Sequence, residues 1–194
     1  MLKLNIQDLW MIANFGGGGS IPSKDYYAAT PAHHPVKSFG SRKTTEEVVS
    51  RGLGRPEFKS AAAHARWLVS QSLWTTISTD ASDRLSDGVA WGNIRSVTDG
   101  ECIFASTGLP VFYLPTPDPT SVDVIANPNI ALTFTEAALP ELIGEDGQVC
   151  GGADPEDPTC AHISLHGTAR KLEEHEIEYV LKSFGTTHPR VSKI

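Results

Sequence analysis

The feature that most constrains this chain is a series of strand-like segments with no helix between them. The segments "LWTTIST" (73–79), "VAWGNIRSVTD" (89–99) and "LPVFYLP" (109–115) are rich in β-branched and aromatic residues and are bounded by Gly, Pro or Asp. Consecutive strands of this kind pair with one another, whereas a doubly wound sheet needs a helix after each strand. The order therefore predicts an α+β fold, a barrel or sandwich of about six antiparallel strands with flanking helices.

The N-terminal segment predicts a long strand with a bulge. In residues 2–13, the apolar positions Leu2, Leu4 and Ile6 share one face, and the pattern then shifts phase to Leu9 and Met11. The segments "IALTFTEA" and "AHISLHGTARKL" predict two further strands nearer the C-terminus.

Three helices accompany these strands. Pro56 is expected at the start of an amphipathic helix, Asp118 as the cap of a short one, and Gly185 as the end of the last helix. Trp67 and Trp74 lie at the junction between the first helix and the next strand, where large apolar residues are typical of a core.

Composition excludes several classes of function. The formal net charge is −7 and the 16 basic residues are dispersed, so nucleic acid is not expected as a partner. No apolar run approaches about eighteen residues, so membrane insertion is not expected, and the first residues do not resemble a signal peptide. His162 and His166 would lie roughly 13 Å apart on one strand, too far to share an ion, and no C-x-x-C motif occurs. No metal site is predicted.

Two of the three cysteines, Cys150 and Cys160, are close in sequence. They enclose a Gly- and Pro-rich loop with little apolar content, and a disulfide there would stabilise the fold by roughly 3 kcal/mol. We predict this disulfide; the alternative is a pair of reduced thiols in a cytosolic protein.

The chain resembles a known family over residues 56–190. The segments that carry the resemblance are "AAAHARWLVSQSLWTTIST", "SVTDG", "STGLPVFYLPTPDPT", "NPNIALTFTEA", "CGGADPEDPTCAHISLHGTA" and "HPR", in this order. They are similar to the CREG family, secreted glycoproteins among the pyridoxamine-phosphate-oxidase-like FMN-binding split barrels. The resemblance implies a split β-barrel.

The order of the remaining segments differs from that of the family. Family members end with a strand resembling "KLNIQDLWMIANFGG" and a tail resembling "IPSKDYYA", which here stand first. We therefore interpret the chain as a circular permutant: residues 1–29 supply the final barrel strand and tail, 30–55 form a flexible bridge, and 56–194 form the main part of the barrel. The alternative is that residues 1–29 are the tail of a preceding tandem copy.

The resemblance also implies a flavin cleft, in which cations hold the FMN phosphate. The matching positions are Arg95, Ser96 and Thr98, and Trp91 or Tyr113 would lie near the ring. The loop after the "FY" strand has no cation and contains Asp118, which would repel a phosphate dianion. FMN binding is therefore expected to be weak or absent.

Two classes of function follow. One is a non-catalytic, dimeric recognition protein with a degenerate flavin cleft and a protein receptor as a possible partner; the other is an FMN-dependent oxidoreductase. The resemblance implies the homodimer, and apolar residues on the strands, such as Ile163, Leu165, Phe112 and Leu114, suggest faces that a second copy would cover. The resemblance implies a secretory or lysosomal setting, yet no N-x-[ST] acceptor occurs in the chain, so the compartment stays unassigned.

Overall fold

The computed structural model describes residues 1–12, 18–29, 58, 60–86, 88–102, 105–143 and 147–189. The bridge predicted over 30–55 and the position of Ile194 lie outside these residues. The described strands are β1 (Leu2–Ile12), β2 (Gly19–Ser20), β3 (Trp74–Asp80), β4 (Ala90–Cys102), β5 (Ala105–Phe112), β6 (Asn129–Thr135) and β7 (His162–Lys171). The described α-helices are α1 (Ser23–Ala28), α3 (Ala61–Gln71), α4 (Pro119–Ala126) and α5 (Glu174–Thr187).

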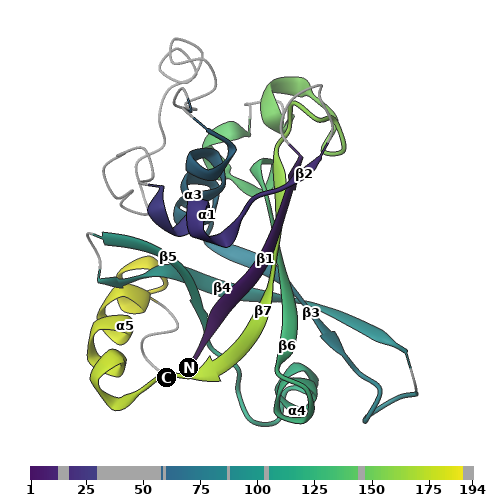
Figure 1. Ribbon diagram of the computed structural model, residues 1–194, viewed down its shortest axis with the longest axis vertical. Helices are drawn as coiled ribbons and strands as arrows, with labels where there is room; N and C mark the ends of the chain where they lie inside the picture. Colours follow the sequence, from purple (N-terminus) through teal and green to yellow (C-terminus); the bar gives the residue numbers. More distant parts are fainter. Residues whose placement is uncertain are drawn as a thin grey trace.

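The strands form one antiparallel sheet that closes on itself. Its order is β2-β1-β5-β4-β3-β6-β7, and the additional pairing of β1 with β7 closes six of the strands into a barrel. Figure 1 shows β1 and β7 side by side, α4 below one end of the barrel and α5 beside β4 and β5. The predicted α+β barrel is therefore confirmed.

The strand that closes the barrel comes from the N-terminus. β1 pairs with β7 from Leu2–Lys171 to Ile12–His162, and the register shifts between Ile6 and Asp8. The bulge predicted from the change of apolar phase is thus confirmed. Gly167 lies opposite Ile6 at this point, and a Cβ on Gly167 would come within 2.1 Å of the Asn5 carbonyl oxygen. Only glycine lets the two strands approach so closely.

Alternate residues of the strands fill the barrel with apolar side chains. The core contains Leu4, Leu9, Ile77, Val97, Phe112, Leu132, Phe134, Ile163 and Leu165. Three residues expected on a face that needs a partner, Phe112, Ile163 and Leu165, are instead fully buried within the single chain. Trp67 is buried as predicted, but Trp74 is 39% exposed and points outward.

Two helix boundaries differ from the predictions. α3 begins at Ala61, because Ser60 caps it by accepting a hydrogen bond from the Ala63 N–H at 3.2 Å. Pro56 therefore does not start this helix. Gly185 lies inside α5, which continues to Thr187 and closes with the His188 N–H donating to the Phe184 carbonyl. The predicted cap at Asp118 of α4 is confirmed.

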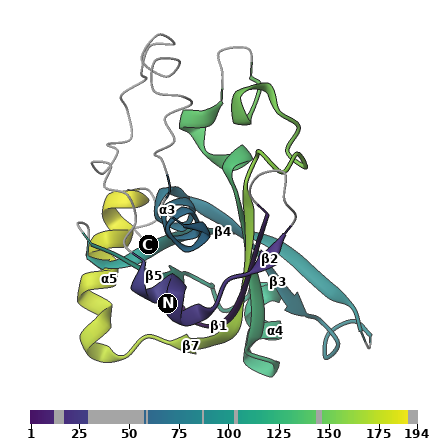
Figure 2. The same ribbon diagram turned by 45° about the horizontal axis from the view of Figure 1, so that its top comes forward.

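The short helix α1 was not predicted, because six residues carry too little periodicity to identify it. It packs against α3, as Figure 2 shows. The guanidinium of the buried Arg66 donates to the carbonyls of Tyr26, Tyr27 and Ala29 at 3.3, 3.3 and 2.9 Å. These hydrogen bonds satisfy carbonyl oxygens that the C-terminal end of α1 leaves without a partner within the helix, where a cation is also favoured by the helix dipole. Arg66 thereby fixes residues 18–29 to the barrel.

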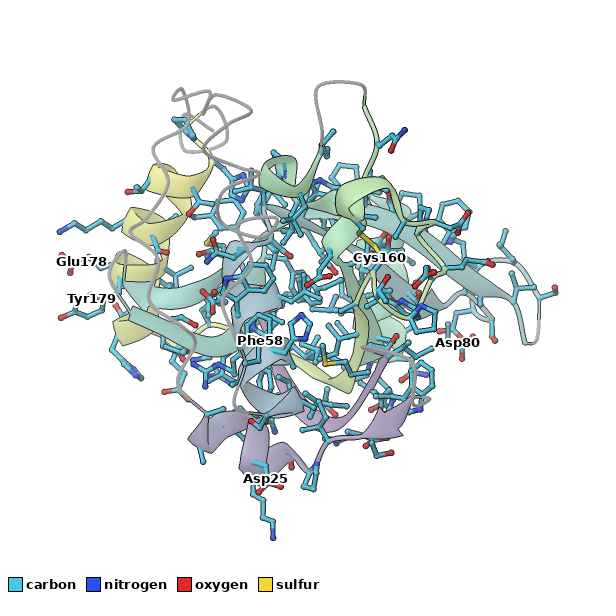
Figure 3. The ribbon with its side chains drawn as sticks, turned by 90° about the horizontal axis from the view of Figure 1, so that it is seen from above. Asp25, Phe58, Asp80, Cys160, Glu178 and Tyr179 are labelled. Atoms are coloured by element: carbon cyan, nitrogen blue, oxygen red, sulfur yellow. A yellow bond between two sulfur atoms is a disulfide. The ribbon has the colours of Figure 1, made fainter. Side chains whose placement is uncertain are left out.

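The predicted disulfide joins Cys150 and Cys160. Both residues are buried, and the bond is visible beside the label of Cys160 in Figure 3. Next to it, the carboxylate of the fully buried Glu136 accepts from the Ala161 N–H at 2.9 Å and pairs with His64 at 2.7 Å. The disulfide loop is thus anchored to α3 through one carboxylate.

A buried ion-pair cluster joins the first strand to the last helix. The Glu176 carboxylate accepts from Lys3 at 3.0 Å and from both Nη atoms of Arg170 at 2.7 Å. It also accepts from the Glu173 N–H at the start of α5. Hydrogen bonds from Arg170 and then from Glu173 and Lys3 outweigh the effect of burial and hold the pKa of Glu176 well below its usual range.

Glu176→Gln is expected to destabilise the fold by about 2 kcal/mol at pH 7, because Lys3 and Arg170 lose the charge they bind. A carboxylate with a lowered folded-state pKa stabilises above its unfolded pKa of about 4.3 and loses that contribution as the pH falls. The difference between wild type and variant should therefore shrink below about pH 4. Urea unfolding at pH 7 and pH 3 measures this.

Glu178→Gln, on the exposed side of the same helix, is the matched control. It should change stability by less than about 0.5 kcal/mol. Equal effects of the two substitutions would show that the cluster contributes nothing specific.

Candidate functional site

The residues predicted to hold a flavin phosphate lie where α4 meets the barrel. Asp118 is the N-cap of α4 and its carboxylate accepts from the Thr120 N–H at 2.8 Å. Pro119 occupies the first helical position, where its missing N–H costs nothing. This local sequence places the Asp118 carboxylate and the Thr120 hydroxyl against the inward side of β4.

Arg95 meets both of these groups. It extends from β4 toward α4, where its guanidinium forms an ion pair with Asp118 and donates to the Thr120 hydroxyl at 3.2 Å. The Arg95 side chain is only 14% exposed. Burial alone would raise the pKa of the Asp118 carboxyl, but hydrogen bonds from Thr120 and Arg95 outweigh it and hold that pKa below its usual value. The Asp118 carboxylate is therefore charged near neutral pH.

A second ion pair lies on the same side of β4. The buried Asp123 of α4 accepts from Arg84 at 3.0 and 3.1 Å and from the Thr79 hydroxyl at 2.9 Å. The Arg84 guanidinium also lies 4.5 Å from the ring centre of Trp91. Trp91 therefore lies under α4, as Arg95 does, and the Arg84 guanidinium lies over its ring.

The other predicted phosphate ligands point away from this cluster. Side chains alternate along a strand, so Ser96 and Thr98 face the outside of the barrel while Arg95 faces inward. The Thr98 hydroxyl lies 3.0 Å from the Ser183 hydroxyl of α5, and Ser96 lies opposite the outward-facing Trp74. Tyr113 follows the buried Phe112 and is 37% exposed.

The three residues predicted at the phosphate, Arg95, Ser96 and Thr98, therefore do not converge on one point. Arg95 and Trp91 share the cluster under α4, whereas Ser96 and Thr98 lie on the opposite side of β4. A dianion at Arg95 would also meet the Asp118 carboxylate. These residues as placed do not fit a phosphate, and the expectation of weak or absent FMN binding stays a prediction.

Sequence reasoning missed the partners of Arg95 and Arg84. Asp118 and Asp123 both lie in "DPTSVD", but Asp118 is the N-cap and the two lie five positions apart, so helix spacing alone does not place both carboxylates on one side of α4. Nothing in the sequence links Arg84 to this helix, because residues 84 and 123 are far apart and meet only through the fold. Among the described residues, no group of His, Cys, Asp and Glu could hold a metal ion. None of the helices in the described part of the chain has the length and apolar content of a membrane span.

Comparison with known proteins gives a consistent result. The model of the family described as "CREG, beta-barrel" matches residues 56–194. Protein CREG2 of Homo sapiens is 30% identical over 167 residues, which cover 85% of this chain and 53% of that protein. Protein CREG2 of Mus musculus is 30% identical over 68% of this chain and 43% of its own length. Protein CREG1 of Homo sapiens is 30% identical over 81% of this chain and 69% of its own. The chain spans about half the length of the CREG2 relatives it matches.

A matched pair of substitutions at Asp118 separates its two contacts. Asp118→Ala removes both the cap and the ion pair and should destabilise the fold by about 1 kcal/mol or more. Asp118→Asn keeps a good capping side chain and removes only the charge, so its effect should be smaller. Thermal unfolding measures both, and a larger loss for Asn than for Ala would contradict the assigned capping role.

Proposed function

Because this chain belongs to the CREG family, we propose that it is a non-catalytic, dimeric split-barrel protein that acts by recognition and has a degenerate flavin cleft. The observation that carries this proposal is the ion pair between Arg95 and Asp118. The one cation that the sequence offers to a phosphate is already bound by a carboxylate and a hydroxyl of α4. A protein receptor is the class of partner that such a molecule would bind.

One observation favours the alternative, an FMN-dependent oxidoreductase. Trp91 Nε1 and Arg95 Nε are buried and have no hydrogen-bond partner within the described residues. Buried donors of this kind usually have a partner, and the oxygen atoms of a bound ligand would supply one. In that case Trp91 and Arg95 would hold the ligand and the flavin would carry the electrons.

The absorbance spectrum of the purified protein separates the two functions. We expect no flavin band near stoichiometric occupancy, and only weak binding when FMN is added, because Asp118 occupies Arg95. A yellow preparation that loses its flavin in Arg95→Ala would favour the oxidoreductase. Asp118→Asn serves as the matched variant, because removing the carboxylate should strengthen any binding of FMN.

We infer that a second copy covers the outer face of the barrel. Phe112, Ile163 and Leu165 lie in the core and Leu114 packs against it, so this surface is built from other, outward-facing residues. One row of paired residues runs across five strands: Ile94, Thr76, Thr133, Ser164 and Trp10. Ile94 and Trp10, at its two ends, are 60% and 42% exposed.

The composition of this row suits close contact with another sheet. Its central residues are small, and Trp74 lies beside Ile94 on the same outer face. Small residues in the middle allow a partner to approach closely, while the large apolar side chains at the ends supply buried area. A self-complementary patch of this kind is what a two-fold dimer requires.

Thr133→Arg tests this surface at its centre. The side chain faces outward, so the fold should be retained, but a charge in the interface should convert the dimer to a monomer in analytical ultracentrifugation. Ile125→Arg on α4, which is 77% exposed and lies outside the row, should leave the dimer intact. A wild-type protein that is monomeric at micromolar concentration would contradict the proposed dimer.

We further infer that the chain is a circular permutant of the FMN-binding split-barrel type. Two observations support this: the family match begins at residue 56, and β1, which precedes it in the sequence, occupies the place between β5 and β7 that closes the barrel. The same segment continues through Tyr26, whose fully buried ring donates from its hydroxyl to the Gly108 carbonyl at 2.9 Å.

Deletion of residues 1–29 distinguishes permutation from the tail of a preceding tandem copy. If the segment belongs to this barrel, deletion opens the sheet and abolishes cooperative thermal unfolding, because a buried edge loses its hydrogen-bond partners. If the segment is only the tail of another copy, the shortened chain should unfold cooperatively, as the full chain does.

A further inference from the structure

The exposed side of α5 carries large apolar residues that the barrel does not use. The helix has 14 residues, and its inner side packs Val180 and Phe184 against the barrel. On the outer side, Ile177 is 41% exposed, Tyr179 58% and Leu181 53%. Figure 3 shows Glu178 and Tyr179 on this helix at the outer edge of the molecule, pointing away from the barrel.

Two of these residues, Ile177 and Leu181, form an ordered stripe with glutamates. Glu174, Ile177, Glu178 and Leu181 follow the spacing i, i+3, i+4, i+7, which places them on one line along an α-helix. All four are exposed. We call these four residues the α5 stripe.

The stability of α5 does not explain the α5 stripe. Acidic residues in the first turn stabilise a helix, which accounts for Glu174, but Glu178 lies beyond that turn. Ile177 and Leu181 contribute little to the core at such exposure, and polar residues would serve the helix equally well. The fourth glutamate of the segment, Glu176, is already bound by Lys3 and Arg170, so it is separate from the stripe.

The charge of the exposed side indicates which partner fits. Three exposed glutamates, Glu173, Glu174 and Glu178, face solvent there, against one exposed lysine, Lys182. A partner that covers Ile177 and Leu181 must therefore place positive charge beside its apolar residues. A narrow stripe along one helix is best matched by a second helix, whose own i, i+3, i+4, i+7 residues pack against it.

We propose that the α5 stripe is a docking surface for a basic amphipathic helix of a partner protein. Leu or Ile side chains of that helix cover Ile177 and Leu181, and its Lys or Arg side chains lie beside Glu174 and Glu178. This surface would serve the recognition role of the proposed function and rests on it, but it involves neither the flavin residues nor the outer barrel row.

The test uses the full chain and a fluorescently labelled synthetic helix with Leu at i, i+3, i+4 and i+7 and Lys at the flanking positions. Fluorescence anisotropy should show saturable binding that weakens as salt is added. The double variant Ile177→Ser with Leu181→Ser should raise the Kd about tenfold or more, as truncation of interface anchors does. Glu174→Lys with Glu178→Lys, which removes no apolar side chain, should abolish binding.

Two controls make the result specific. Ile125→Ser removes an apolar residue of α4 that is 77% exposed, and it should leave the Kd unchanged. A second peptide with Glu in place of every Lys should bind at least about tenfold more weakly, because it meets like charge. The flavin spectrum and the Thr133→Arg dimer test do not use the α5 stripe. If either of them contradicts the proposed function, the anisotropy measurement of peptide binding can still be interpreted.

Three results would overturn the proposal. The first is that the Lys peptide shows no saturable binding to the wild-type chain. The second is that both double variants bind the Lys peptide with the wild-type Kd. The third is that the Glu peptide binds the wild-type chain as tightly as the Lys peptide does. If the wild-type chain is dimeric and the variant with both Ile177→Ser and Leu181→Ser is monomeric, the α5 stripe is instead a contact with a second copy of this chain. That result would also contradict the proposed basic helix as the partner.

Discussion

The pairing of β1 with β7 is the interaction on which the rest of this structure depends. Without β1, strands β5 and β7 would be the two edges of an open sheet, and the apolar residues between them would be exposed. β1 lies at the N-terminal end of the sequence and β7 lies near the C-terminal end. Contacts between residues far apart in the sequence therefore hold β1 in its place. Gly167 admits the β1 bulge, Glu176 binds Lys3 of β1, and Arg66 binds the carbonyls that follow β2.

Local patterns predicted the parts of the fold that depend on neighbouring residues. The change of phase between Ile6 and Leu9 predicted the bulge, Asp118 predicted a helix start, and the spacing of Cys150 and Cys160 predicted the disulfide. Helix ends were less predictable. Ser60 and Pro56 are both residues that can start a helix, and the sequence does not show which of the two is used. Gly185 can end a helix but is also tolerated within one.

The candidate site was less predictable, because it depends on which side of a strand faces the core. Alternation places Arg95 and Ser96 on opposite sides of β4, but the sequence does not state which side is inside. The closed barrel decides this: it turns Arg95 toward α4 and Asp118, and Thr98 toward α5. The same reason explains Ile163 and Leu165, which look like surface residues when their strand is considered alone and are core residues once the sheet closes. A site assembled from residues as distant as Arg84 and Asp123 needs the fold before it can be identified.

Amide hydrogen exchange along β1 tests this account most directly. If β1 closes the barrel, the amides that bond to β7, from Leu4 to Met11, should exchange only when the whole molecule unfolds. Their opening free energy should then equal that of the amides of Leu132 on β6 and Leu165 on β7. Much faster exchange in β1, while β6 and β7 remain protected, would show that the N-terminal strand is a loosely attached end and would contradict the central role assigned to it.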